Sequence, residues 1–233
     1  QAHVQRVEYS PDNGALVSVS LEPETQADTM VKRWDALKGE LVQAATWLKR
    51  RGQRLDLWSF AWAKEAGHII TAGAMDEVSI WNTLKGERLA RLSPSQNHRS
   101  SDPTAKAQQV IVLSGGSYAV SGHSGGSLVV WDLKAQNEVS RTSQVHQEGV
   151  STLTQFQDDK ENFISLSGKG RVRHWRLEKS ILQIRKSKPI EGQEVTAVVA
   201  ATGQGYFTGH ANGAVKRWGS GRNEPTAYTR KGE

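Results

Sequence analysis

The chain has 233 residues, with 30 lysines and arginines against 24 acidic residues, a formal net charge of +6 and no cysteine. The lack of cysteine excludes disulfides, thiolate zinc sites and cysteine nucleophiles, and the modest positive charge favours anionic partners. No apolar stretch reaches the roughly 20 residues of a membrane-spanning helix, and no signal peptide is visible, so we expect a cytoplasmic protein.

The first part of the chain contains four expected β-strands. Large apolar residues alternate along residues 4–9, and the turn residues 11–14 follow them. Further strands are expected at residues 16–20 and 31–35, with a weaker outer strand at 40–42. Proline, asparagine and glycine supply the fixed and the positive φ angles that the first turn requires. The same order of strands is found four more times along the chain.

The third strand of each unit ends in a tryptophan that follows a run rich in β-branched and basic residues. These tryptophans are Trp34, Trp81, Trp131, Trp175 and Trp218, at intervals of 43 to 50 residues. Such a period indicates the blades of a β-propeller, because a single four-stranded blade cannot bury its two faces without neighbours. We therefore predict an all-β fold, a β-propeller with five four-stranded antiparallel blades.

The later units give the remaining strands and the limits of the blades. Second strands are expected at residues 69–73, 118–122, 163–167 and 206–209, and the glycine-rich turns after most of them suit tight hairpins. Outer strands are expected at 87–92, 138–140, 182–184 and 226–229. The blades span approximately residues 1–45, 46–92, 104–141, 146–186 and 190–233, and a polar connector covers 93–103.

Together these motifs resemble the WD40-repeat family along essentially the whole chain. The turn at residues 10–14 and the hairpin that leads into Val-x-x-Trp-Asp both match that family. The resemblance implies a ring of radially packed blades, in which an N-terminal strand commonly completes the last blade. Here the chain begins on an inner strand at Val4, so we favour a segment of a larger ring, of about seven blades, over a five-blade unit. The remaining blades are then missing from this chain.

The resemblance also implies structural roles for several residues. A buried indole N–H needs an acceptor, which in this family is a strand serine or threonine backed by a loop histidine and a turn aspartate. Only fragments of that network are visible: His146 accompanies Trp175, and Asp28 accompanies Trp34. We interpret the five tryptophans, His146 and Asp28 as structural, and we expect incomplete polar support in every blade.

Two segments depart from the repeat without strong charge. One is the insertion at residues 21–27 between the second and third strands of the first blade, and the other is the connector at 93–103. Long loops on a rigid scaffold often carry recognition, but the composition of the connector is also typical of disorder. We favour the disordered interpretation for the connector.

A third departure is the basic loop at residues 47–54, just before the inner strand of the second blade. Its cations are Lys49, Arg50, Arg51 and Arg54. Such a group can bind phosphate, an acidic peptide or nucleic acid. Arg50-Arg51-Gly52 also faintly resembles the double-arginine-glycine motif of the phosphoinositide-binding propellers of autophagy. The alternative is a solvated basic loop without a ligand.

The upper rim, formed by the starts of the inner strands and the turns between second and third strands, is the expected place for a peptide or protein partner. Candidate contact residues there are Trp58, Arg54, His123, His210, Lys169 and Glu148. His123 and His210 occupy equivalent turns of blades that are not adjacent, and no carboxylate accompanies them. We therefore expect repeat positions at these two histidines rather than a metal site.

The sequence shows no glycine-rich phosphate loop, no spaced cluster of metal ligands and no serine elbow. We therefore expect no enzymatic activity, no cofactor and no metal. The function that we predict is a non-catalytic scaffold that binds a protein or peptide through the rim of a propeller. The alternative is a module that binds an anionic ligand, phosphoinositide or nucleic acid, through the basic loop.

Overall fold

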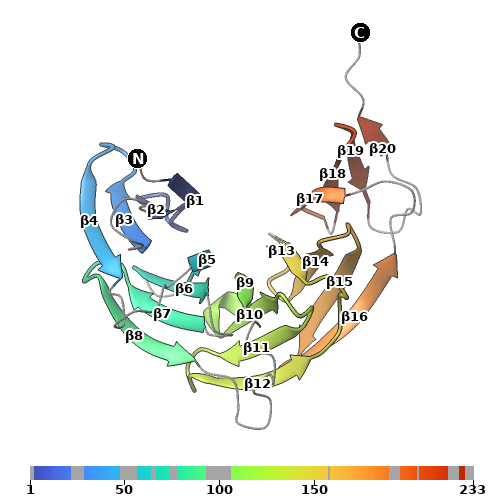
Figure 1. Ribbon diagram of the computed structural model, residues 1–233, viewed down its shortest axis with the longest axis horizontal. Helices are drawn as coiled ribbons and strands as arrows, with labels where there is room; N and C mark the ends of the chain where they lie inside the picture. Colours follow the sequence, from blue (N-terminus) through green and yellow to red (C-terminus); the bar gives the residue numbers. More distant parts are fainter. Residues whose placement is uncertain are drawn as a thin grey trace.

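The structure, a computed structural model, describes residues 3–21, 29–47, 57–63, 67–73, 78–92, 106–156, 158–188, 195–203, 205–219 and 226–228. Within them, twenty strands form five four-stranded antiparallel sheets. The sheets stand side by side along an open arc, with the first strand of each towards the middle and the fourth on the outside (Figure 1). This part of the chain holds no helix long and apolar enough to cross a membrane.

Each sheet is one blade, and its four strands follow one another along the chain. Blade one contains β1 (His3–Tyr9), β2 (Ala15–Leu21), β3 (Thr29–Asp35) and β4 (Leu41–Trp47). Blade two contains β5 (Leu57–Trp62), β6 (His68–Gly73), β7 (Val78–Asn82) and β8 (Glu87–Leu92). Blade three contains β9 (Ala107–Leu113), β10 (Tyr118–His123), β11 (Leu128–Asp132) and β12 (Asn137–Thr142). Blade four contains β13 (Val150–Gln155), β14 (Asn162–Ser167), β15 (Val172–Glu178) and β16 (Ile181–Lys188), and blade five contains β17 (Val195–Ala200), β18 (Tyr206–His210), β19 (Val215–Trp218) and β20 (Thr226–Tyr228).

The repeat in the sequence corresponds to one fixed register between the second and third strands. In every blade the tryptophan pairs with the residue two positions before a serine or threonine of the second strand. The pairs are Trp34 with Leu16, Trp81 with Ile69, Trp131 with Ala119, Trp175 with Phe163 and Trp218 with Tyr206. Because side chains alternate along a strand, this register brings the same positions to the same face in all five blades.

A β-bulge recurs near the start of every inner strand. The unpaired residues are Gln5, Trp58, Gln108, Ser151 and Thr196. A bulge adds one residue to one strand, bends that strand and re-aims the side chain at the bulge. The five bulged residues therefore occupy one common position, outside the regular alternation of the inner strands.

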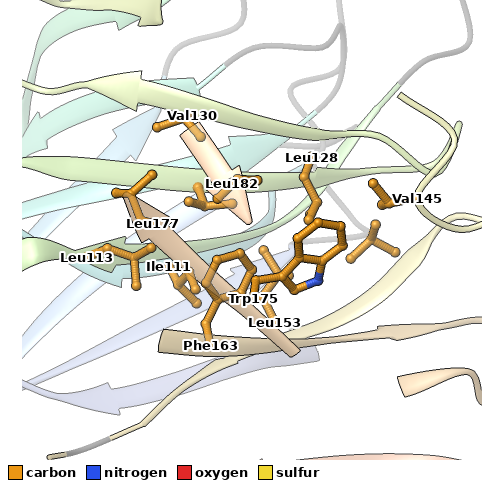
Figure 2. Packing of buried hydrophobic residues seen from close by; sticks show 12 residues of the cluster. Ile111, Leu113, Leu128, Val130, Val145, Leu153, Phe163, Trp175, Leu177 and Leu182 are labelled. Carbon is orange, nitrogen blue, oxygen red and sulfur yellow. The ribbon is translucent and has the colours of Figure 1, made fainter. Parts of the chain in front are cut away.

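Apolar clusters between neighbouring blades hold the arc together. Between blades three and four, Trp175 is buried and stacks on Phe163, with ring centroids 6.3 Å apart and the ring planes 15° apart. Leu128 of β11 lies in the same cluster (Figure 2). Truncating such a buried aromatic residue typically costs about 3–5 kcal/mol. The tryptophan of a blade thus packs towards the preceding blade.

The residue three positions before the tryptophan packs the other way. Val172 belongs to a separate cluster that includes Val195 and Val198 of blade five. Each blade therefore has a trailing face, which carries the tryptophan and meets the preceding blade, and a leading face, which meets the following blade. Every interface between two blades joins one leading face to one trailing face.

The all-β propeller fold predicted from the sequence is confirmed, with five blades of four antiparallel strands. Three outer strands, β4, β12 and β16, are longer than predicted, whereas β8 has the predicted bounds and β20 ends one residue earlier. β4 runs to Trp47, which pairs with Thr29 and is not part of a loop. Extra backbone pairing with the third strand accounts for the added length. The insertion after Leu21, the connector at 93–103 and residues 48–54 of the basic loop lie outside the described residues.

Candidate interaction surface on the upper rim

The upper rim contains Trp58, Lys106 and four loop segments, 124–126, 146–149, 168–171 and 211–213. Main-chain bonds hold its segments together. The N–H of Ser124 donates to the carbonyl of Lys106 at 2.9 Å, and the N–H of His146 donates to the carbonyl of Gly126 at 3.1 Å. The turn of one blade is thereby tied to the start of its own inner strand and to the loop of the next blade.

Trp58 is the most prominent aromatic residue of this rim. It is the bulged residue of β5, and 42% of its surface is exposed. The ammonium group of Lys106, which precedes the inner strand of blade three, lies 5.5 Å from the centroid of the indole ring. A cation over an exposed tryptophan contributes about 0.5–1 kcal/mol, so the contact is weak and the indole stays accessible to a ligand.

The inner strands beneath Trp58 are tied to one another. The hydroxyl of Ser59, next to Trp58, accepts a 2.8 Å bond from Arg6 of blade one and a 3.3 Å bond from the N–H of Val110 of blade three. Arg6 also donates to Glu8 at 2.8 Å, and burial raises the pKa of that carboxyl despite the arginine beside it. Three blades thus support the backbone that presents Trp58, as a precise binding site requires.

Lys169 and Glu148 meet in an ion pair on the same rim, with 3.2 Å between Nζ and Oε1. The lysine is exposed and the glutamate partly so. An exposed pair of this kind contributes little to stability, about 0–1 kcal/mol, and either head group can exchange its partner for a ligand. Arg171, two residues further along, is exposed as well and adds to the positive charge of this part of the rim.

The five tryptophans all have an acceptor for the indole N–H. The bonds run from Trp34 to Ser18 at 2.9 Å, Trp81 to Thr71 at 3.0 Å, Trp131 to Ser121 at 2.7 Å, Trp175 to Ser165 at 2.8 Å and Trp218 to Thr208 at 2.9 Å. The polar support of these residues is therefore more complete than the sequence indicated. Asp28 lies outside the described residues.

His123 and His210 are buried, in contrast to the exposed position expected for a contact with a partner. Nε2 of His123 lies 2.7 Å from the hydroxyl of Ser121, and Nε2 of His210 lies 2.9 Å from that of Thr208. These are the hydroxyls that accept the indole bonds of blades three and five. We therefore leave both histidines out of the proposed contact surface.

His146 reaches the same kind of hydroxyl from a loop instead of a strand. Its Nε2 lies 2.7 Å from the hydroxyl of Ser165, and the ring is buried. Burial, and then the charges of Arg173 and Arg171, lower the pKa of His146 from 6.5 to about 4. The imidazole is thus neutral near pH 7, in keeping with a structural role beside the indole of Trp175.

Sequence reasoning missed Lys106, although its place could have been inferred. It stands immediately before the inner strand of blade three, and the register brings that position beside the turn after the second strand. Arg54, Lys49, Arg50 and Arg51 lie outside the described residues. Among the residues with a described position, no group of three histidine, aspartate or glutamate side chains is arranged to hold a metal ion.

No protein-family model and no curated protein matches the sequence. Solved structures do match its fold. A crystal structure of RRP9 WD40 repeats superimposes with a TM-score of 0.74 at 16% identity, over 97% of this chain and 62% of the other. A structure of U3-55K gives 0.72 at 16% identity, over 97% and 63%.

The chain thus spans a little under two thirds of the length of the solved chains that it matches. At 16% identity the likeness concerns the fold. Five four-stranded blades, one tryptophan register and the match to WD40 structures agree with one another: the chain has the fold of a WD40-repeat β-propeller, of which it forms five blades.

Proposed function

We propose that the chain is a non-catalytic interaction scaffold that binds a peptide or protein across the upper rim of blades two to four. WD40 propellers typically serve as interaction scaffolds, which is the coarse basis of the proposal. The observation that carries the finer statement is the exposed indole of Trp58 beneath the ammonium group of Lys106. Exposed tryptophans on a rigid support are frequent anchors of protein interfaces.

Charge and shape around Trp58 indicate the kind of partner. The upper rim of blades two to four carries three cations, Lys106, Lys169 and Arg171. Its acidic residue Glu148 forms an ion pair with Lys169. An extended peptide that places an apolar or aromatic side chain on Trp58 and carboxylates beside the cations fits this surface. The buried histidines behind it keep the turns fixed and do not contribute contacts.

A selection of random peptides displayed on phage, with the 233-residue chain as bait, tests this proposal. We expect the enriched peptides to lose about tenfold or more of their affinity for Trp58→Ala, because loss of an aromatic anchor costs roughly 2 kcal/mol. Lys106→Ala is expected to weaken the same peptides.

The matched control is Tyr9→Ala. Tyr9 is also an exposed aromatic residue on an inner strand, but it lies at the opposite end of that strand, away from the upper rim. Peptides bound at the upper rim keep their affinity for this variant. Enriched peptides that ignore Trp58→Ala and Lys106→Ala but lose affinity for Tyr9→Ala would place the site on the other rim and defeat the proposal.

The anionic-ligand alternative stays a second proposal, supported by the net charge of +6 and by the four cations of the basic loop. Its residues are Lys49, Arg50, Arg51 and Arg54. Retention of the chain on phosphoinositide liposomes or on an oligonucleotide is expected to vanish in the Arg50→Glu/Arg51→Glu variant and at high salt. Retention unchanged under both conditions excludes this alternative.

Two broader expectations also remain proposals. A cytoplasmic location is one. The other is that further blades belong to the same ring, which is supported by the coverage of 62% and 63% of the two solved chains.

A further inference from the structure

Arg173 brings a guanidinium group to the interface between blades three and four. It lies on the third strand of blade four, directly opposite Ser165, whose hydroxyl bonds to the indole of Trp175 and the ring of His146. Side chains that lie opposite each other in neighbouring antiparallel strands share one face of the sheet. Arg173 therefore stands on the trailing face of blade four beside His146, whose pKa is lowered to about 4 by burial and then by the charge of Arg173.

The counterparts of Arg173 in the two preceding blades carry no charge. Ser79 lies opposite Thr71 in blade two. Val129 lies opposite Ser121 in blade three. Both counterparts are buried, at 9% and 0% exposure. Blade four thus places a cation where these blades bury an uncharged side chain, which is costly unless an anion compensates the charge.

The guanidinium of Arg173 includes a donor without an acceptor. Its Nε is buried and has no hydrogen-bond partner among the described residues. Burial, and then the charge of Arg171, lower the pKa of Arg173. A buried donor without a partner is rare in folded proteins, and a bound ion is one of the explanations for it. For a guanidinium group, the ion that fits is an oxyanion.

Arg171 supplies a second cation, two residues before Arg173 and next to the start of β15. Residues two apart along an extended chain point to the same face and lie about 6.6 Å apart. Arg171 is exposed, and after burial its charge is among the causes that lower the pKa of both His146 and Arg173. One anion can therefore meet both guanidinium groups, one from the rim and one from the interface.

The backbone that carries the two arginines is fixed by its neighbours. The N–H of Arg171 donates to the hydroxyl of Ser167 at 3.0 Å, and its carbonyl accepts from the N–H of Ser167 at 3.0 Å. Gly170 of the same turn lies so close to blade five that a Cβ would stand 2.7 Å from the backbone nitrogen of Val195. Arg173 lies in a strand that is paired on both sides. Such a support gives the preorganisation that a binding site requires.

Among the described residues, the positive charge around this pair is only partly balanced. Glu148 is the carboxylate that acts on His146, and it already forms an ion pair with Lys169 at 3.2 Å. His146 is neutral near pH 7 because its pKa is about 4. Three cations, Lys169, Arg171 and Arg173, thus stand against one carboxylate. A tetrahedral dianion such as phosphate matches this excess of charge, and its oxygens can accept from both guanidinium groups at once.

We infer that Arg171 and Arg173 form a binding site for a phosphate group at the upper edge of the interface between blades three and four. The phosphate oxygens accept hydrogen bonds from Nε and the Nη groups of Arg173 and from the guanidinium of Arg171. The bound anion supplies the missing negative charge and thereby stabilises the interface. The site needs no peptide on Trp58 and none of the cations of the basic loop, so it stands or falls independently of both proposals made for them.

Thermal unfolding and calorimetry test this site. The melting temperature is measured in sodium phosphate and in sodium chloride of equal ionic strength and pH, so that charge screening is the same in both. We expect phosphate at about ten times its dissociation constant to raise the melting temperature by about 3–5 °C relative to chloride. Isothermal titration calorimetry with inorganic phosphate gives the dissociation constant.

Arg173→Val gives the sharpest comparison, because it introduces the residue that blade three has at this position. We expect this variant to bind phosphate at least about tenfold more weakly, since it loses charge-assisted hydrogen bonds. In chloride it should be at least as stable as the unsubstituted chain, because an apolar residue replaces an uncompensated cation in the interface. Arg171→Gln, at an exposed position, should weaken phosphate binding without a loss of stability in chloride.

Lys216→Val is the matched control. Lys216 occupies in blade five the strand position that Arg173 occupies in blade four, but the residue two positions before it is Ala214. The variant removes the same charge from the same position of a blade, and it should keep the phosphate affinity of the unsubstituted chain. Arg50→Glu/Arg51→Glu, in the basic loop, should keep it too.

O-phosphoserine and serine distinguish the sources of the phosphate group. Because Arg171 is exposed, we expect O-phosphoserine to bind as inorganic phosphate does, so that a phosphate group carried by a larger molecule can enter the site. Serine should not bind. Binding of inorganic phosphate without binding of O-phosphoserine would assign the site to the free ion.

Each of four results overturns the inference. One is an equal phosphate affinity of the unsubstituted chain and Arg173→Val. Another is a loss of affinity in Lys216→Val as large as in Arg173→Val, because net charge then explains the effect. The third is an Arg173→Val variant that melts well below the unsubstituted chain in chloride, because the guanidinium then already has a compensating partner. The fourth is a loss confined to Arg50→Glu/Arg51→Glu, which would place the phosphate on the basic loop.

Discussion

Gly126 and His146 touch backbone to backbone. The N–H of His146 donates to the carbonyl of Gly126 at 3.1 Å, and a Cβ on Gly126 would stand 1.5 Å from the carbonyl oxygen of His146. The turn of blade three and the loop into blade four can approach this closely only because residue 126 has no side chain. The contact also fixes His146, whose ring supports the hydroxyl that accepts the indole bond of Trp175.

Gly126→Ala is therefore expected to be strongly destabilising, by about 3 kcal/mol or more, since it combines a positive φ with a backbone clash. Gly213→Ala has the same φ but open space and should cost about 1 kcal/mol. Gly125→Ala, with neither feature, should be close to neutral. Urea unfolding of the three variants should show this order, and equal effects of Gly126→Ala and Gly213→Ala would contradict the contact.

Ser165→Ala should destabilise blade four by about 1–3 kcal/mol, because it leaves the buried N–H of Trp175 without its acceptor and removes the partner of His146. Ser18→Ala is the matched control. The indole of Trp34 is only half-buried, so water can replace the lost hydroxyl and the cost should be smaller. Denaturant unfolding followed by tryptophan fluorescence measures both variants, and equal losses would argue against the buried network.

The stability of the protein should fall as the pH is lowered from about 6.5 towards 4. The pKa of His146 is lowered from 6.5 to about 4 in the folded chain, chiefly by burial and then by Arg173 and Arg171. In this interval the unfolded chain binds the proton and the folded chain does not, so unfolding is favoured as pH falls. Above pH 7 the residue is neutral in both states and has no effect.

His146→Gln should flatten this dependence, since glutamine can still reach Ser165 but does not titrate. Part of the slope should remain, because burial and Lys216 also lower the pKa of His210. Melting temperatures measured between pH 4 and 8 provide the comparison. A slope unchanged by His146→Gln would show that His146 is not buried in the neutral form.

Lys179→Asn should stabilise the hairpin between β15 and β16 by about 0.5–1 kcal/mol. Glu178 and Ile181 pair across a two-residue turn in which Lys179 and Ser180 both have positive φ, at 49° and 66°. Asparagine adopts this conformation more readily than lysine does. Lys134→Asn, in a turn without positive φ at that residue, should leave the melting temperature unchanged. A melting temperature raised equally by both substitutions would contradict the explanation.

The fold could be predicted because its signal is repeated five times, so that an error at one unit does not affect the others. Trp34 and Trp218 are alike in register although the residues around them differ. The role of His123 could not be predicted with the same certainty. The spacing of His123 from Ser121 is compatible with an exposed histidine in the turn and also with a hydrogen bond between the ring and the Ser121 hydroxyl. The conformation of the folded turn determines which of the two occurs.

Contacts between blades were likewise hidden from the sequence. Nothing in the residues around Lys106 indicates that its ammonium group meets Trp58 of the preceding blade. Such a contact depends on the angle between two sheets, which the packing of side chains in their interface determines. The lengths of the outer strands depend on tertiary pairing for the same reason, as the continuation of β4 to Trp47 shows.

The bulge near the start of each inner strand distinguishes two groups of positions in a blade: those where a neighbouring blade restricts substitution, and one where it does not. Substitutions on the leading and trailing faces are constrained by the neighbouring blade, but the residue at the bulge is excluded from that packing. The five bulged positions hold two glutamines, a serine, a threonine and one tryptophan, at Gln5, Gln108, Ser151, Thr196 and Trp58. A duplicated blade can thus acquire a new surface by changing one codon while its interfaces stay compatible with every other blade, which makes the array easy to diversify without loss of assembly.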